Sequence, residues 1–207
     1  YLVPNNPDLF GYKGWNFLRA INVGLANYHK PVLDNEARRN WYIGEARLLR
    51  GWFYADKVSK FGNVQWVDRE VTISDDEILY GARDDREFVM EKVLEDLNFA
   101  SEHIPHDWGD GNAPGRLNRW CALLVKSRVC LFEGTWRKYH GGSNPEMWLQ
   151  EAADAALELI QNGPYSLYLT GNPADAYNAL HRLKDYTGNP EVLYWRRYQL
   201  GIFTNHV

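Results

Sequence analysis

The chain has 207 residues, of which 45% are hydrophobic and 24% charged, and this balance excludes a disordered or low-complexity protein. Its formal charge of −4 at pH 7 and the lack of an arginine-rich tract argue against a nucleic acid as partner. No run of 18 apolar residues is present, so the sequence predicts no membrane-spanning helix.

The first predicted helix follows an irregular start that contains two prolines. Asp8 is a candidate N-terminal cap, and the helix is expected to end near Tyr28, before Pro31. Asp34 or Asn35 can cap the next helix. These two helices are therefore expected to form an antiparallel hairpin joined by a short turn.

The stretch Trp41–Gly62 is the longest segment without a helix breaker. Its apolar residues recur three and four positions apart and cover most of its girth, so we expect a central helix that other helices surround. The residues predicted to belong to its structural core are Trp41, Trp52, Phe53, Glu45 and Arg50. The two charged members are expected in paired, buried polar contacts rather than in a functional site.

The remaining predicted elements are a short extended piece at 64–67, helices at about 86–104, 118–139, 146–161 and 175–181, and an extended segment at 191–198. Asp84 and Asp85 with Glu87 resemble a capping box. Asn118 is a candidate cap, and so is Asn144, which stands before a proline.

These elements predict an all-α fold with long loops and little sheet, in which residues 1–207 form a single helical domain. The helix pairs 12–28 with 35–60, and 118–139 with 145–161, look like a repeated hairpin somewhat longer than the period of about 34 residues in tetratricopeptide repeats. We therefore expect an irregular α-solenoid of tetratricopeptide-like hairpins, a class of fold that usually presents surfaces to other molecules.

Six segments resemble, in the same order, signatures of the SusD/RagB family. The central one begins at Gly44, reads GEARLLRGWFY and ends in FGNV; it closely resembles the family's GEARFLRAFYYFDLVRRFGDVPL. The other matching segments lie at 80–87, 94–105, 115–131, 148–167 and 189–193. The resemblance spans nearly the whole chain, with departures such as Gly51 in place of an alanine and Gln65-Trp66 in place of Pro-Leu.

The resemblance implies a surface glycan-binding lipoprotein of Bacteroidetes that is not an enzyme. Such a protein sits on the extracellular face of the cell outer membrane, captures an oligosaccharide or polysaccharide, and delivers it to a SusC-like TonB-dependent transporter. The family's lipid-bearing cysteine does not occur here. We therefore expect a fragment that lacks the N-terminal lipid anchor and the C-terminal loop-rich part, and with them most of the family's sugar-stacking aromatics.

Sugar binding requires flat aromatic faces for the apolar side of pyranose rings and planar polar groups for their hydroxyls. Outside helix interiors, two clusters have this composition, and ordinary packing is the alternative for each. The candidate carbohydrate-binding residues are Trp108, Asp107 and Asn112 in one loop, and Trp136 and Tyr139 at the end of the predicted helix 118–139, before Gly141-Gly142.

The sequence predicts no metal site and no cofactor. The oxygens of the loop 107–112 have a spacing like that of calcium ligands, but the loop lacks the twelve-residue pattern and its final Glu. His103 and His106 have no evident third ligand. Cys121 and Cys130 should lie on opposite faces of one helix, roughly 13 Å apart along it, so they cannot form a disulfide.

Catalysis has no support from the sequence, because it contains no nucleophile elbow, phosphate loop, His-Glu-x-x-His motif or convincing carboxylate pair. Two other functions stay open. One is a protein-interaction module in which the helical repeats are the whole function, and the other is a helical enzyme that cleaves glycans.

Overall fold

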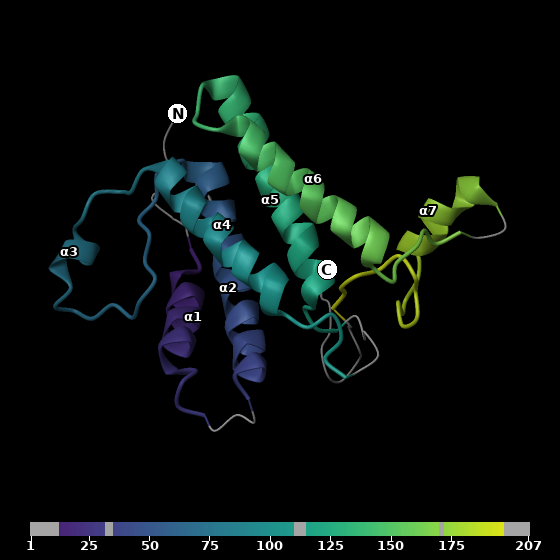
Figure 1. Cartoon of the computed structure of the whole chain (residues 1–207), viewed down its shortest axis with the longest axis horizontal. Helices are drawn as coiled ribbons and strands as arrows, with labels where there is room; N and C mark the ends of the chain where they lie inside the picture. The colour runs from purple at the N-terminus through teal and green to yellow at the C-terminus, as the bar shows by residue number, and fades with distance from the viewer. Residues whose placement is uncertain (1–12, 32–34, 110–114, 170–171, 197–207) are drawn as a thin grey trace.

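The computed structural model describes residues 13–31, 35–109, 115–169 and 172–196 (Figure 1). Within these ranges the chain forms seven helices and no strand. The helices are α1 (Trp15–Asn27), α2 (Glu36–Phe61), α3 (Asp76–Leu79), α4 (Arg86–His103), α5 (Arg119–His140), α6 (Pro145–Asn162) and α7 (Pro173–His181). The predicted all-α class is confirmed.

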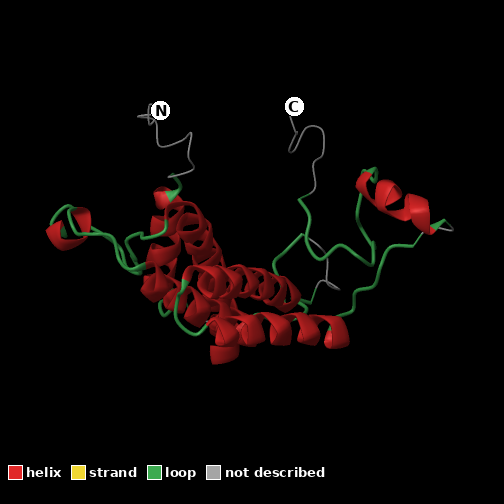
Figure 2. Ribbon diagram, turned by 90° about the horizontal axis from the view of Figure 1, so that it is seen from above, coloured by secondary structure: helices red, strands yellow, loops and turns green. Residues whose placement is uncertain are grey.

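The long helices form a row. α1 packs on α2, α2 on α4, α4 on α5, and α5 on α6, so each helix lies beside its neighbours in sequence (Figures 1 and 2). α3 sits in a loop that stands out from one edge of the row, and α7 lies beyond the other edge (Figure 1). This arrangement confirms the predicted solenoid of helix hairpins.

The core runs through the row, and α2 contributes to it while it contacts α1, α4 and α5. The fully buried side chains that fill it include Leu48, Tyr54, Val89, Leu97 and Trp148. Both cysteines are buried and free, as their spacing predicted.

The prediction that Trp52 belongs to the core is wrong, because 49% of this side chain is exposed. Successive residues on a helix are about 100° apart, so three consecutive aromatics cannot all face the same neighbour. Tyr54 takes the buried position, whereas Phe53 packs against the core while only partly buried. Trp41 is also only partly buried.

The charged residues of α2 are paired, as expected. Arg50 is buried and donates two hydrogen bonds to the carboxylate of Asp96 on α4, at 2.7 and 2.9 Å. Glu45 is partly exposed and accepts a bond of 3.2 Å from Arg116. These contacts explain both residues as parts of the scaffold.

A second ionic cluster joins α4 to α5. Glu133 is fully buried and accepts two bonds from the guanidinium of Arg86, at 2.9 and 2.7 Å, and one from Arg137 Nε at 2.7 Å. Arg137 also donates to the backbone oxygen of Ser143, in the turn that leads to α6. The cluster therefore ties three helices together.

The predicted caps meet different outcomes. Asn35 and Asn118 accept bonds from the backbone amides of Arg38 and Cys121, as predicted. Asn144 is not a side-chain cap, since its backbone is left-handed (φ 51°) and its side chain makes no capping bond. The first helix begins at Trp15, and the predicted cap Asp8 lies outside the described residues.

The capping box at the start of α4 is half formed. The Asp85 side chain accepts a bond from the backbone amide of Glu87. The Glu87 carboxylate does not return to Asp85, because it accepts a 2.9 Å bond from the backbone amide of Ser143. The start of α4 is thereby linked to the turn between α5 and α6.

Candidate functional site

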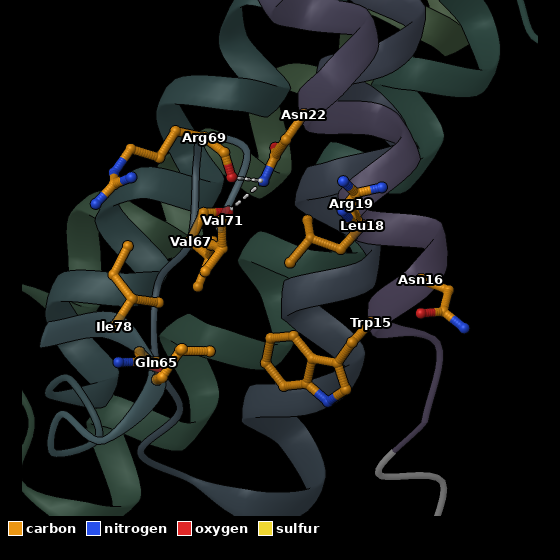
Figure 3. Close-up of a pocket in the computed structure, with 11 residues that line it drawn as sticks. Trp15, Asn16, Leu18, Arg19, Asn22, Gln65, Val67, Arg69, Val71 and Ile78 are labelled. Atoms are coloured by element: carbon orange, nitrogen blue, oxygen red, sulfur yellow. Dashed lines mark hydrogen bonds between the residues drawn. The ribbon is translucent and has the colours of Figure 1, made fainter. Parts of the chain in front are cut away.

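A cavity of about 330 Å³ lies between α1 and the segment that links α2 to α3 (Figure 3). Its apolar wall consists of Trp15, Leu18, Val67, Val71, Ile78 and Leu79, and its polar lining of Asn16, Arg19, Asn22, Gln65 and Arg69. This composition, an aromatic ring and aliphatic groups with a polar border, is typical of sites for small organic ligands.

Alternation along the linking segment supplies one wall. Its lining residues Gln65, Val67, Arg69 and Val71 are every second residue, as expected when successive side chains of an extended chain point to opposite sides. Asn22 of α1 holds this segment in place by donating to the backbone oxygens of Val67 and Arg69, at 2.8 and 3.2 Å (Figure 3).

Tyr54 of α2 also binds the same segment, through its side-chain hydroxyl. Its hydroxyl accepts a 2.7 Å bond from the amide of Val67 and donates to the backbone oxygen of Gln65 at 3.2 Å. Burial raises the pKa of the Tyr54 phenol, so the hydroxyl keeps its proton and can serve as donor and acceptor. The wall of the cavity is therefore anchored on two helices.

The charges at this cavity are paired. Arg19 of α1 lies 2.6 Å from Glu70, and Arg69 lies 2.7 Å from Asp75. Hydrogen bonds from the Thr72 backbone amide and from Arg69 lower the pKa of Asp75 to about 2. Each of these two arginines in the cavity wall is therefore paired with a carboxylate.

The groups available to a ligand are an aromatic ring and an amide. Trp15 is half-buried and meets Phe53 edge to face, with ring centroids 5.4 Å apart, so its ring is held in one orientation. The side-chain amide of Gln65 makes no hydrogen bond within the described part of the chain.

Trp108, the first predicted sugar platform, is engaged within the protein. The Arg116 guanidinium lies 3.4 Å from its ring centre, and its indole nitrogen donates to the backbone oxygen of Leu117 at 2.8 Å. Asp107 accepts a bond from the amide of Gly109 in the same loop. Asn112 lies outside the described residues.

Trp136, the second predicted platform, is also covered. The Arg86 guanidinium lies 3.5 Å from its ring centre, and the His140 ring stacks on it at 4.7 Å between centroids. The Trp136 ring is therefore in contact with two side chains of the protein. Tyr139 is 77% exposed.

The structure does not bring the two predicted clusters together. Trp108 lies before the first turn of α5 and Trp136 in its last turn, and a helix of 22 residues is roughly 33 Å long. Neither cluster contributes to the cavity beside α1. A carbohydrate role for these residues stays a prediction, whereas their packing within the scaffold is observed.

No protein-family model and no curated protein matches this sequence. Solved structures do match. A SusD-like protein from Bacteroides fragilis superposes with a TM-score of 0.71 at 23% identity, over 89% of this chain and 32% of its own. A crystal structure with xylogluco-oligosaccharide gives 0.68 at 22% identity, over 89% and 34%. A laminarin-binding SusD-like protein gives 0.61 at 19% identity, over 82% and 34%.

The chain has the helical fold of the SusD-like proteins. It spans about a third of the length of the solved structures that it matches. In this SusD-like scaffold, none of the described helices combines the length and apolar character needed to cross a membrane. In the same described ranges, no three His, Cys, Asp or Glu side chains come together as a possible metal site.

The SusD-like scaffold has a second hollow, a groove of about 370 Å³ between α2 and α5. Trp52 lines it from α2, and Leu124 and Phe132 line it from α5; all three side chains are exposed. Asp56 and Arg128 add one charge of each sign. An exposed groove with large apolar side chains is typical of a surface that meets another protein segment.

Sequence reasoning missed the cavity because its parts are distant in the chain. Trp15 lies within the first predicted helix, and the sequence singles out Gln65 only as a departure from the family pattern. The signal available was the alternation that starts at Val64. The alternation predicts an extended segment whose alternate side chains face the same side, but it does not show that α1 lies against that side.

Proposed function

We propose that this chain belongs to a SusD-like protein that binds a glycan without cleaving it. The observation that carries the proposal is the match along 89% of the chain to a crystal structure with xylogluco-oligosaccharide. A match to a laminarin-binding SusD-like protein supports it. Both likenesses concern the helical scaffold, so the choice of site rests on the chemistry of this chain.

The cavity beside α1 is the proposed place of binding. The apolar face of a pyranose ring would pack on Trp15, and its hydroxyls would pair with the unpartnered amide of Gln65. The rings of Trp108 and Trp136 are already covered by arginine side chains, which makes them weaker candidates. Trp15 is therefore the proposed stacking residue.

The finer parts of the proposal concern partner and place. By resemblance, residues 1–207 would be the helical part of a longer, lipid-anchored protein on the extracellular face of the outer membrane. That protein would hand its glycan to a SusC-like TonB-dependent transporter. The exposed groove between α2 and α5 supports a scaffold that also contacts a protein.

Affinity electrophoresis of the full-length protein tests glycan binding. Native gels containing xyloglucan, laminarin or other polysaccharides should retard the wild type, and the substitution Trp15→Ala should abolish the retardation while the circular dichroism spectrum stays unchanged. Tyr139→Ala is the matched control, because it removes an exposed aromatic ring at the far end of α5. If no polysaccharide retards the protein, glycan binding is rejected.

The same variants also decide where the sugar binds. If Tyr139→Ala removes retardation and Trp15→Ala does not, the site lies at the end of α5, as the sequence predicted. Reducing ends released during prolonged incubation would instead indicate an enzyme.

A protein-interaction module is the second candidate, and the α2–α5 groove favours it. If the helical repeats are the whole function, the protein should retain the transporter in a pull-down, and Phe132→Ser should weaken retention. Retention that does not change in this variant, or that is absent in the wild type, would contradict this alternative.

A further inference from the structure

The loop between α2 and α4 forms an open ring that carries α3 and stands out from the row of helices (Figure 1). Another cavity, of about 520 Å³, lies within it. Trp66 lines this cavity from the arm next to α2, and Glu77 and Arg83 line it from the other side of the ring. Gln65, Arg69 and Ile78 line both this cavity and the one beside α1, so the two adjoin.

Specific contacts hold the ring closed. Val64 and Asp84 form an antiparallel backbone bridge, and the Asp84 carboxylate accepts a 2.7 Å bond from the amide of Trp66. Gly81 allows the close approach of the two arms. A Cβ atom there would lie 2.2 Å from the backbone oxygen of Glu77 and 3.0 Å from Nε2 of Gln65. The amide of Gln65 therefore lies beside Gly81, at the boundary between the cavities.

The charged groups around the two cavities include no excess of positive charge. Arg19 and Arg69 are paired with Glu70 and Asp75, as described above. Arg83 and Glu77 have opposite charges and make no hydrogen bond within the described part of the chain. Asp84 adds a negative charge, so the ring provides no excess positive charge for a carboxylate or sulfate group.

We infer that the ligand is a neutral oligosaccharide of at least two sugar residues, which runs from the cavity beside α1, past Gln65, into the ring cavity. The inference rests on the proposed function and specifies its substrate class. Each cavity has the volume of a small-ligand site, so one sugar residue fills only part of the combined space. Glu77 and Arg83 pair with hydroxyls of the second sugar unit. The carboxylate of a uronic acid at that position would lie beside the negative charges of Glu77 and Asp84.

Isothermal titration calorimetry of the full-length protein tests length and charge. The probes are oligosaccharides of six or more residues from laminarin and xyloglucan, glucose, and a galacturonic acid hexamer. A neutral oligosaccharide should bind at least about tenfold more tightly than glucose, as one or two extra hydrogen bonds would produce. Equal affinity for glucose, or for the acidic hexamer, would overturn the inference.

A ring variant tests the path. Arg83→Ala should weaken binding of the neutral oligosaccharide about threefold to tenfold, which corresponds to the loss of one hydrogen bond. Glu91→Ala, on the exposed side of α4, is the control and should bind like the wild type. If Arg83→Ala and Glu77→Ala both bind like the wild type, the ring is not part of the site and the inference fails.

The outcome separates this inference from the proposed function. When the ring variants have no effect but Trp15→Ala still abolishes binding, the protein is a glycan binder with a shorter site. When no carbohydrate binds to the wild type, the proposed function fails, and the inference fails with it.

Discussion

The carboxylate of Glu133 is enclosed by two arginines, and its removal should be costly. Glu133→Ala would leave Arg86 and Arg137 buried without their counter-charge. We expect the free energy of unfolding to fall by about 3–5 kcal/mol, measured by urea denaturation of the full-length protein. Glu133→Gln keeps an acceptor oxygen and should lose less.

A surface ion pair provides the comparison for that measurement. Glu95 on α4 pairs with Lys92 at 2.8 Å, but more than half of the Glu95 side chain is exposed. Glu95→Ala should therefore change stability by less than about 0.5 kcal/mol. Equal losses for Glu133→Ala and Glu95→Ala would show that burial does not strengthen the Glu133 cluster.

Asp75 should titrate far below an ordinary aspartate. Bonds from the Thr72 amide and Arg69 favour its charged form and lower its pKa from 3.8 to about 2. Since the folded pKa is the lower one, this contribution to loop stability is present above about pH 4 and is lost as the pH falls through 2. Carbon-13 NMR of the Asp75 carboxyl should show a midpoint near 2.

The substitution Arg69→Ala separates the two causes. It should raise the pKa of Asp75 only part of the way, because the backbone amide of Thr72, the larger cause, is unchanged. A wild-type midpoint near 3.8 would contradict the hydrogen bonds seen here.

At the scale of the helix, α2 shows which consequences of its sequence were predictable. Its position, cap and pairing of Arg50 follow from apolar spacing, an asparagine before the first turn and the cost of a buried charge. The choice among Trp52, Phe53 and Tyr54 does not follow, because periodicity alone does not say which part of a broad apolar face meets α4.

That choice can be measured. Tyr54→Ala should lower the free energy of unfolding by about 3–5 kcal/mol, because it empties a fully buried position and removes the hydroxyl that holds Val67. Trp52→Ala should cost only about 1–1.5 kcal/mol, because half of the ring is already in water. Thermal or urea unfolding of both variants checks the order, and a larger loss for Trp52→Ala would contradict this placement.

Local signals also failed where distant parts of the chain compete for a side chain. The sequence Asp84 to Glu87 predicts a reciprocal capping box, yet Asp85 is the cap and the Glu87 carboxylate binds the Ser143 amide instead. Asn144 has the right residue type for a cap, but its left-handed backbone turns the side chain away from that role. Both outcomes depend on the turn between α5 and α6, which sequence spacing does not place beside α4.

For the whole molecule, the sequence predicted the scaffold better than the site. Helix length and hairpin order follow from periodicity and breakers, which act within a few turns. The candidate site combines Trp15 with Gln65 and Arg69, some 50 residues later, around hydrogen bonds from Asn22. Local sequence patterns do not predict that these distant residues come together in one site. Trp108 and Trp136 illustrate the converse, since both aromatic rings, one in a loop and one near the end of α5, proved to be covered by arginines.

The exposed groove predicts how residues 1–207 behave when produced alone. Trp52, Leu124 and Phe132 present apolar area to water on one face. We expect concentration-dependent self-association in sedimentation velocity experiments, and Phe132→Ser should reduce it. A chain that stays monomeric at high concentration would show that this apolar surface does not drive self-association.

The cluster around Glu133 also constrains how the sequence can change over evolutionary time. Arg86 serves Glu133 and covers the Trp136 ring, while Arg137 reaches the turn before α6. Replacing any one of the charged residues leaves the other two buried, with a missing partner and no water to replace it. In an alignment of homologous chains, positions 86, 133 and 137 should therefore change together, with apolar residues replacing all three, or not change at all.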